Sequence, residues 1–181
     1  MAHVHQLSVK HPPPPVLSPQ QPLPTRPLHM LGAASGWGYP DHGCALAPDQ
    51  LRLASKALWL QAGGGIGWAG VVRAPDAGAA TPLAAVAAFN RRLARRVRKL
   101  MAGDALPVII GGDHAIAPGT WAGVRKALDG PLGLIWIDTH LDAHTPATTP
   151  TGNIHGMPLA ALLGQGPRAL TSPLGAAPIV S

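Results

Sequence analysis

The sequence predicts an α/β protein with a mainly parallel sheet flanked by helices, and three observations support this fold class. Short, nearly continuous apolar runs alternate with helix-like segments over residues 28–138. Such runs are typical of strands that are buried on both faces of a parallel sheet. Hydrophobic residues make up 46% of the 181 residues and aromatic residues only 4%. The core therefore has to be built from small aliphatic side chains in closely packed helix and sheet layers.

The first three elements are expected to be a strand, a helix and a second strand. Residues 28–35, LHMLGAAS, form an apolar run, and the turn-rich segment GWGYPDHG follows it. A helix is expected over about residues 48–62, because Pro48 and Asp49 occupy its first turn, where both residue types are favourable. The run GIGWAGVVRA at 65–74 is expected to be the second strand.

The later elements repeat this alternation. Apolar residues at helical spacing, with arginines between them, predict a helix over about 82–102. The short run PVII at 107–110 predicts a buried strand. A helix is expected over roughly 118–129 and should end at Gly130. The run LGLIWID at 132–138 is expected to be a further strand beside the one at 107–110.

The chain divides into a proline-rich tail, 1–27, and a partial domain, 28–181. The tail contains four consecutive prolines and almost no periodic apolar pattern, so we expect it to be disordered with polyproline II character. The stretch PLPTRP suits a proline-recognition groove, although an unselected extension is the preferred interpretation.

Charge and cysteine content limit the partners and the compartment. The formal charge of +6 is concentrated in the helix at 82–102, but no aromatic residues interleave with its arginines, so we expect a solvated face and no nucleic-acid binding. Cys44 is the single cysteine, which favours a reducing, cytoplasmic location. No apolar run approaches the ~20 residues of a spanning helix, and we expect neither membrane insertion nor secretion.

Two clusters of ionisable side chains follow predicted strands. GGDH, 111–114, follows the strand that ends at Ile110, and DTHLD, 138–142, follows the strand that ends at Ile137. Functional groups of parallel α/β sheets gather at the carboxyl ends of the strands. In an extended chain residues i, i+2 and i+4 point the same way, so the acid, imidazole and acid of DTHLD can converge there.

The combined donor set predicts a divalent metal site. Two imidazoles and two carboxylates suit an ion harder than copper; manganese is a fair choice and zinc is possible. Asp138 could bridge a pair of ions ~3.5–4 Å apart, a geometry that polarises water and implies hydrolysis. Asp113 is interpreted as a turn or helix-capping residue.

Two motifs in these segments resemble the arginases, the dimanganese ureohydrolases that convert L-arginine to L-ornithine and urea. They are GGDHAIAPGTW and WIDTHLDAHTPATTPTGNIHGMPLAALLG, and the resemblance extends over residues 31–171. HTPATTPTGNIHG in particular separates arginases from agmatinases and formimidoylglutamases. The resemblance implies a three-layer fold of the arginase and deacetylase type, and a homo-oligomer for the full-length family.

The resemblance also implies roles for individual residues. His114 and Asp142 would bind one manganese ion, His140 the other, and Asp138 would bridge the pair. His155 would donate a proton to the departing amine, a role that suits imidazole near neutral pH. The amino-acid end of the substrate would be held by His144, Thr149, Thr151 and Asn153. Many arginases carry asparagine in place of His144. The imidazole of His144 either donates a hydrogen bond to the substrate carboxylate or belongs to a partly exposed loop histidine.

A second D-x-D pair and a downstream glutamate complete the family site, and neither occurs before Ser181. We therefore expect an N-terminal portion of an arginase, truncated at the C-terminus, that is inactive by itself. One alternative is a non-catalytic fragment or pseudoenzyme that retains a metal site. Another is a ureohydrolase that acts on agmatine.

Overall fold

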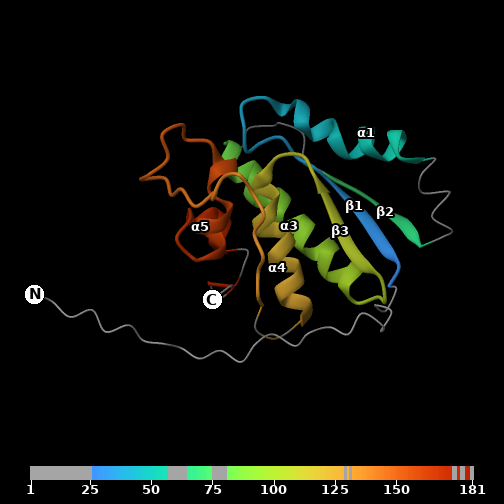
Figure 1. Ribbon diagram of the computed structural model, residues 1–181. Coiled ribbons are helices and arrows are strands. Elements are labelled where there is room, and N and C mark those ends of the chain that lie inside the picture. The colour runs from blue at the N-terminus through green and yellow to red at the C-terminus, as the bar shows by residue number, and fades with distance from the viewer. Residues whose placement is uncertain are drawn as a thin grey trace, which may run out of the picture.

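The computed structural model describes residues 26–56, 65–74, 81–128, 130, 132–172, 175 and 178–179. Within these ranges the strands form one parallel sheet in the order β2-β1-β3 (Figure 1). The strands are β1 (Leu28–Ala34), β2 (Ile66–Arg73) and β3 (Leu106–Gly111). β1 is therefore central, and β2 is an edge strand.

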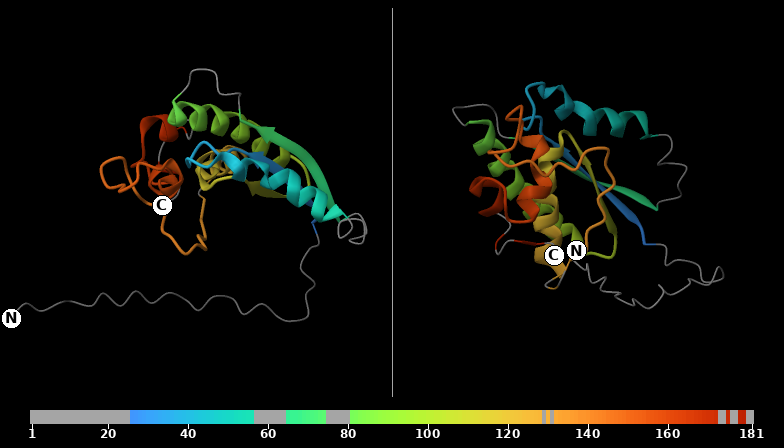
Figure 2. Two further views of the ribbon diagram at one scale, coloured as in Figure 1. Left: turned by 90° about the horizontal axis from the view of Figure 1, so that it is seen from above. Right: turned by 60° about the vertical axis from the view of Figure 1, so that its left-hand side comes forward.

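Helices cover both faces of this sheet. They are η1 (His42–Leu46), α1 (Ala47–Ala54), α3 (Pro82–Met101), η2 (His114–Ile116), α4 (Ala117–Leu128), η3 (Ile154–Gly156), α5 (Pro158–Leu162) and α6 (Arg168–Thr171). The chain moves outward from β1 to β2 and then back across β1 to β3. Right-handed crossovers in these opposite directions place α1 and α3 on opposite faces (Figure 2).

The main core lies between β1 and α3. Leu31 and Ala33 of β1 are fully buried against Phe89 and Leu93 of α3. The intervening Gly32 faces the other side of the sheet, where a Cβ would lie 2.9 Å from the Cβ of Pro48 in α1. The strand alternation of β1 thus supplies one layer of contacts to each neighbouring helix.

α4 packs closely on α3 because it carries two glycines at the contact. A Cβ at Gly119 would lie 2.8 Å from the Cα of Asn90, and one at Gly123 would lie 2.7 Å from the carbonyl oxygen of Ala94. The buried Asn90 side chain donates a hydrogen bond from Nδ2 to the carbonyl of Ala115 at 2.9 Å. This bond fixes α3 to η2, the segment that begins at His114.

Most predicted elements are confirmed, with bounds shifted by a residue or two. The strands at 28–35, 65–74 and 107–110 correspond to β1, β2 and β3, and the helices at 82–102 and 118–129 correspond to α3 and α4. The helix predicted over 48–62 is α1, which ends at Ala54; residues 57–64 lie outside the described part. Residues 1–25 of the predicted tail also lie outside it.

The prediction of a strand at 132–138 is wrong. This segment is extended but has no strand structure, and within the described chain it forms no backbone hydrogen bond to β3. Leu132, Leu134 and Trp136 pack instead on a cluster that includes Ala122 of α4 and Leu162 of α5. Their apolar surface is therefore buried by helices without any pairing in the sheet.

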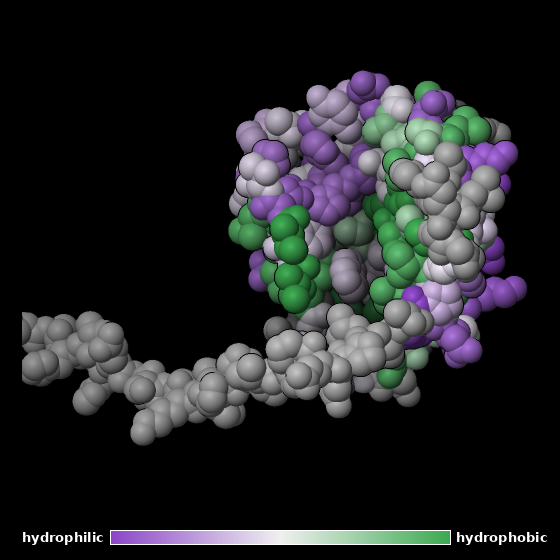
Figure 3. Space-filling model, turned by 45° about the vertical axis from the view of Figure 1, so that its right-hand side comes forward, coloured by the Kyte–Doolittle hydropathy of each residue, from purple (hydrophilic) through white to green (hydrophobic). Residues whose placement is uncertain are grey.

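The other side of this extended segment is open to solvent. Ile135 is 86% exposed and Ile137 is 94% exposed. On the face that Figure 3 presents, apolar side chains stand on both sides of a hollow. No helix in the described ranges combines the length and apolar content needed to cross a bilayer.

Candidate metal centre and adjoining cavity

The site begins at the turn that follows β3. A Cβ at Gly112 would lie 1.9 Å from the carbonyl oxygen of Ser35, so only glycine allows this turn to pass so close to the end of β1. The backbone N–H of Asp113 donates to the same Ser35 carbonyl at 2.9 Å. The turn thereby delivers His114 to the first position of η2, at the carboxyl edge of the sheet.

Asp113 caps η2 and also holds a distant loop. Its side chain is 7% exposed; Oδ1 accepts a hydrogen bond from the N–H of Ala115 at 2.7 Å, and Oδ2 accepts one from the N–H of Gly38 at 3.0 Å. Burial raises the pKa of Asp113, while these two hydrogen bonds oppose the rise. The predicted capping role is confirmed, and the link to Gly38 is an additional contact that the sequence did not reveal.

Three of the four predicted metal ligands lie together. Nδ1 of His114 lies 2.6 Å from Oδ2 of Asp142 and 3.3 Å from Oδ2 of Asp138. One ligand atom from each residue lies within 4.8 Å of the other two. Trp136 stacks on the His114 ring with centroids 4.8 Å apart and an interplanar angle of 19°, which holds the imidazole in this orientation.

This arrangement fits a divalent cation. Two carboxylates converge on one imidazole nitrogen, and their mutual repulsion is relieved when a cation lies between them. One nitrogen and two carboxylate oxygens form the mixed donor set that manganese and zinc accept. The backbone N–H of His140 donates to Oδ1 of Asp138 at 2.9 Å and holds the pKa of that carboxyl below its usual value.

His140 lies beside this group but not within it. Its side chain is 81% exposed, and its Nδ1 lies 3.8 Å from Oδ1 of Asp138. The simple alternation expected for DTHLD does not hold: the chain bends at Thr139 and His140, and Asp142 has a left-handed backbone with φ of +51°. Asp138 and Asp142 both reach His114, and the role of His140 as a metal ligand stays a prediction.

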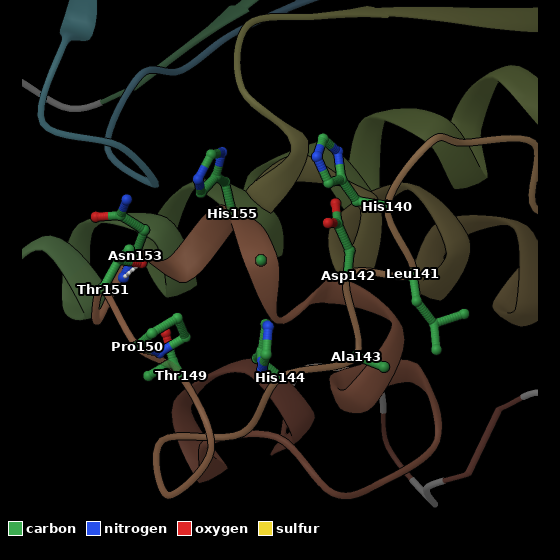
Figure 4. Close-up of a pocket in the computed structure, with 11 residues that line it drawn as sticks. His140, Leu141, Asp142, Ala143, His144, Thr149, Pro150, Thr151, Asn153 and His155 are labelled. Carbon is green, nitrogen blue, oxygen red and sulfur yellow. Dashed lines mark hydrogen bonds between the residues drawn. The ribbon is translucent and has the colours of Figure 1, made fainter.

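A cavity of about 470 Å³ adjoins the carboxylate of Asp142 (Figure 4). All five side chains that the sequence suggested for catalysis and substrate binding line this one space. Its lining includes His140, Asp142, His144, Thr149, Thr151, Asn153 and His155. Figure 4 shows Asp142 and His140 on one side and Thr149, Thr151 and Asn153 across from them.

The loop around this cavity is shaped by its own short-range hydrogen bonds. Oγ1 of Thr149 accepts from the N–H of Gly152 at 3.0 Å, and Oγ1 of Thr151 accepts from the N–H of Asn153 at 3.2 Å. Gly152 adopts φ of +74°, which favours glycine at this turn. Each hydroxyl still has a proton to donate, so both threonines can hydrogen-bond an anionic ligand group.

His144 and His155 are positioned by backbone contacts. The N–H of His144 donates to the carbonyl of Gly156 at 3.0 Å, and the N–H of His155 donates to the carbonyl of Gly38 at 3.1 Å. The ring of Tyr39 lies 5.0 Å from the ring of His155. Asp113 therefore supports His155 through the Gly38 loop, and the His155 ring also acts electrostatically on the Asp113 carboxyl.

Sequence reasoning missed Tyr39 and Trp136 as neighbours of the site. Trp136 carried a local signal, since it is an aromatic residue two positions before Asp138. Tyr39 carried none, because only the fold brings residue 39 to His155.

The fold and the site define a class: a parallel α/β protein with a candidate divalent-metal centre and a polar cavity at the carboxyl ends of its strands. Comparison with known proteins identifies the family within this class. Residues 26–173 match the model of the arginase family, and the chain belongs to this family.

The similar proteins match this chain in sequence and fold over only part of their own length. The arginase of Bacillus caldovelox is 51% identical over 96 residues, which are 53% of this chain and 32% of that protein. The arginase of Agrobacterium fabrum is 34% identical over 155 residues, 75% of this chain and 45% of that protein. A crystal structure of Bacillus subtilis arginase matches with a TM-score of 0.76 and 35% identity, covering 86% of this chain and 54% of that chain.

These relatives confirm the resemblance to the arginases, the predicted fold class and the assignment to a family of hydrolases. The chain spans about half the length of the solved arginases that it matches. A structure of Entamoeba histolytica arginase in complex with L-ornithine matches with a TM-score of 0.73 and 32% identity, over 83% of this chain and 53% of that chain.

Proposed function

We propose that the chain provides the metal-binding and substrate-loop portion of an arginase, which hydrolyses L-arginine to L-ornithine and urea. The observation that carries this proposal is the convergence of His114, Asp138 and Asp142 beside the cavity lined by His155. Membership of the arginase family supports the choice of substrate.

His114, Asp138 and Asp142 would hold a divalent ion, and His140, whose Nδ1 lies 3.8 Å from Oδ1 of Asp138, would join them. We propose manganese, with zinc as the alternative that the same donors accept. Such an ion supplies Lewis acidity and lowers the pKa of water. The charges of Asp138 and Asp142 would balance that of one divalent ion, so the loaded site would not repel the guanidinium group.

The cavity would orient the substrate so that its guanidinium faces the carboxylates. Its volume of about 470 Å³ lies within the usual range for small ligands, ~300–1,000 Å³. His144, Thr149, Thr151 and Asn153 would bind the α-carboxylate and α-ammonium groups of the substrate. His155, on the edge of the same cavity, would protonate the amine that leaves as ornithine.

The described residues contain one cluster of three potential ligands, which supports one ion more readily than a pair. We therefore propose that the 181-residue chain binds a single ion and turns over little arginine by itself. The same observation favours a second candidate function, a metal-binding protein of the arginase family without catalysis.

Manganese titration followed by EPR of the free ion tests the site. The full chain should bind one ion, and His114→Ala and Asp142→Asn should each weaken binding by at least tenfold, because each removes a direct ligand. His29→Ala is the matched control, since His29 is exposed on β1 and lies outside the cluster. Equal binding by all four proteins would contradict the site.

Urea release tests the reaction. A chimera that joins residues 26–173 to the C-terminal half of Bacillus subtilis arginase should release urea from arginine in preference to agmatine, and His155→Ala should lower kcat in this chimera. A folded, manganese-loaded chimera without urea release would refute the arginase assignment and support the non-catalytic alternative.

A further inference from the structure

A second cavity lies between α3 and the edge strand β2, which run alongside each other in Figure 2. Its volume is about 590 Å³, and it shares no described lining residue with the first cavity. Five of the seven side chains that line it are cationic. The lining consists of Val71, Val72, Arg73, Arg92, Arg95, Arg96 and Lys99.

The positions of these cations follow from the helix repeat. Arg92, Arg95 and Arg96 and then Lys99 are spaced at i, i+3, i+4 and i+7, so all four share one face of α3. Leu93 and Val97, on the neighbouring face, are fully buried in the core. Core packing therefore fixes the rotation of α3 and turns its basic face toward β2.

Arg96 is anchored by an irregularity in β2. The register between β1 and β2 shifts near Gly70, which has φ of +101°. At this bulge the Ala69 carbonyl accepts a hydrogen bond from a terminal guanidinium nitrogen of Arg96 at 2.6 Å. The bond satisfies an edge-strand acceptor and holds one guanidinium at the wall of the cavity.

The cavity has a surplus of positive charge. Arg73 is paired with Asp49 through two contacts, at 2.9 and 3.1 Å, and this pairing raises the pKa of Arg73. No carboxylate lines the cavity among the residues that the structure describes. Several like charges that face one space repel each other, and a bound anion relieves that repulsion.

We propose that this cavity binds a compact, multivalent phosphate anion, either inorganic pyrophosphate or the phosphate chain of a nucleotide. Guanidinium groups donate paired hydrogen bonds that match phosphate oxygens, and Lys99 adds a mobile ammonium group. The site is shallow and open, and its cations lie on two different elements, α3 and β2. A small anion can contact groups of both elements at once, which favours it over a flat duplex or a lipid surface.

A second copy of this chain is a poor occupant. All eight acidic residues are aspartates, and three of them, Asp113, Asp138 and Asp142, belong to the candidate metal centre or its support. The remaining aspartates are scattered along the chain, so its sequence offers no acidic segment to match the cavity.

Calorimetric titration of the full chain with pyrophosphate, in metal-free buffer of low ionic strength, tests the proposal. The double variant Arg92→Gln/Arg95→Gln should bind pyrophosphate about tenfold more weakly, because it removes two of the facing charges. Arg91→Gln/Arg98→Gln is the matched control: it removes the same charge from exposed positions of α3 that do not line the cavity. The control should change affinity by less than about twofold.

Helical circular dichroism of both double variants should equal that of the unaltered chain, since all four arginines are exposed.

ATP and orthophosphate are titrated in parallel with pyrophosphate. Tighter binding of ATP than of pyrophosphate identifies a nucleotide as the ligand, and equal binding of the two identifies the phosphate chain alone. Absence of pyrophosphate binding, or equal weakening in the two double variants, would overturn the proposal. Binding of duplex DNA or anionic vesicles through Arg92 and Arg95 without pyrophosphate binding would overturn it too.

Discussion

Asp113→Asn tests whether one buried carboxylate holds the candidate site together. In the protein, its two oxygens accept hydrogen bonds from the N–H groups of Ala115 and Gly38, at 2.7 and 3.0 Å. Asparagine keeps the shape but replaces one oxygen with an NH₂ group, which is a donor. Whichever way the amide is oriented, one buried N–H loses its acceptor and faces another donor.

The expected loss is about 1–3 kcal/mol of unfolding free energy, the cost of leaving one buried donor unsatisfied. The lower end of this range applies if relief of carboxylate burial offsets part of the cost, since burial raises the pKa of Asp113. Urea denaturation measures the change. Amide hydrogen exchange locates it, and we expect faster exchange at Gly38 and at His155, whose N–H donates to the Gly38 carbonyl.

Asp104→Asn is the matched control, because the same chemical change is made at an exposed position. It should alter the unfolding free energy by less than about 0.5 kcal/mol. If Asp113→Asn costs no more than this control and leaves exchange at Gly38 unchanged, Asp113 does not hold the Gly38 loop.

Two further predictions concern the turn after β3 and a surface ion pair. Gly112→Ala should lower the unfolding free energy by more than about 3 kcal/mol, because its Cβ would meet the Ser35 carbonyl at 1.9 Å. Gly133→Ala is the control and should be tolerated, because no described atom lies within 4 Å of its Cβ. Equal effects of the two substitutions in denaturation would contradict the close approach at Gly112. The hydrogen bond from Arg73 holds the pKa of Asp49 below its usual value, so the pair should stabilise the fold above about pH 4 and lose its contribution as the pH falls through the lowered pKa. The difference in unfolding free energy between the unaltered chain and Asp49→Asn should therefore shrink on acidification. A difference that grows would refute the stabilising role of the Asp49–Arg73 pair.

The elements that the sequence predicted correctly are those with strong local patterns. β1, β2 and β3 are short apolar runs bounded by glycine or proline, and α3 combines a threonine cap, a proline in its first turn and helical apolar spacing. The segment 132–138 has the same local pattern as a buried strand. A local pattern cannot distinguish pairing in a sheet from packing against α4 and α5, and here the helices provide the contact.

The candidate site shows the same limit. The motifs identified the donor residues, and His114, Asp138 and Asp142 do lie together. The bend at Thr139 and His140 and the left-handed backbone of Asp142 break the extended row that the spacing predicts, and no spacing rule for extended chains includes them. The contact between Asp113 and Gly38 joins residues that are 75 positions apart, so only the fold reveals it.

We propose that His114, Asp138 and Asp142 form one metal site at the carboxyl edge of the sheet. Anomalous diffraction at the manganese edge, from crystals grown with Mn²⁺, is the decisive test of this site. We expect an anomalous peak within bonding distance of the His114 imidazole and both carboxylates, and loss of that peak in Asp142→Asn crystals. A manganese peak bound by other residues, or no peak at saturating Mn²⁺ in a folded protein, would contradict it.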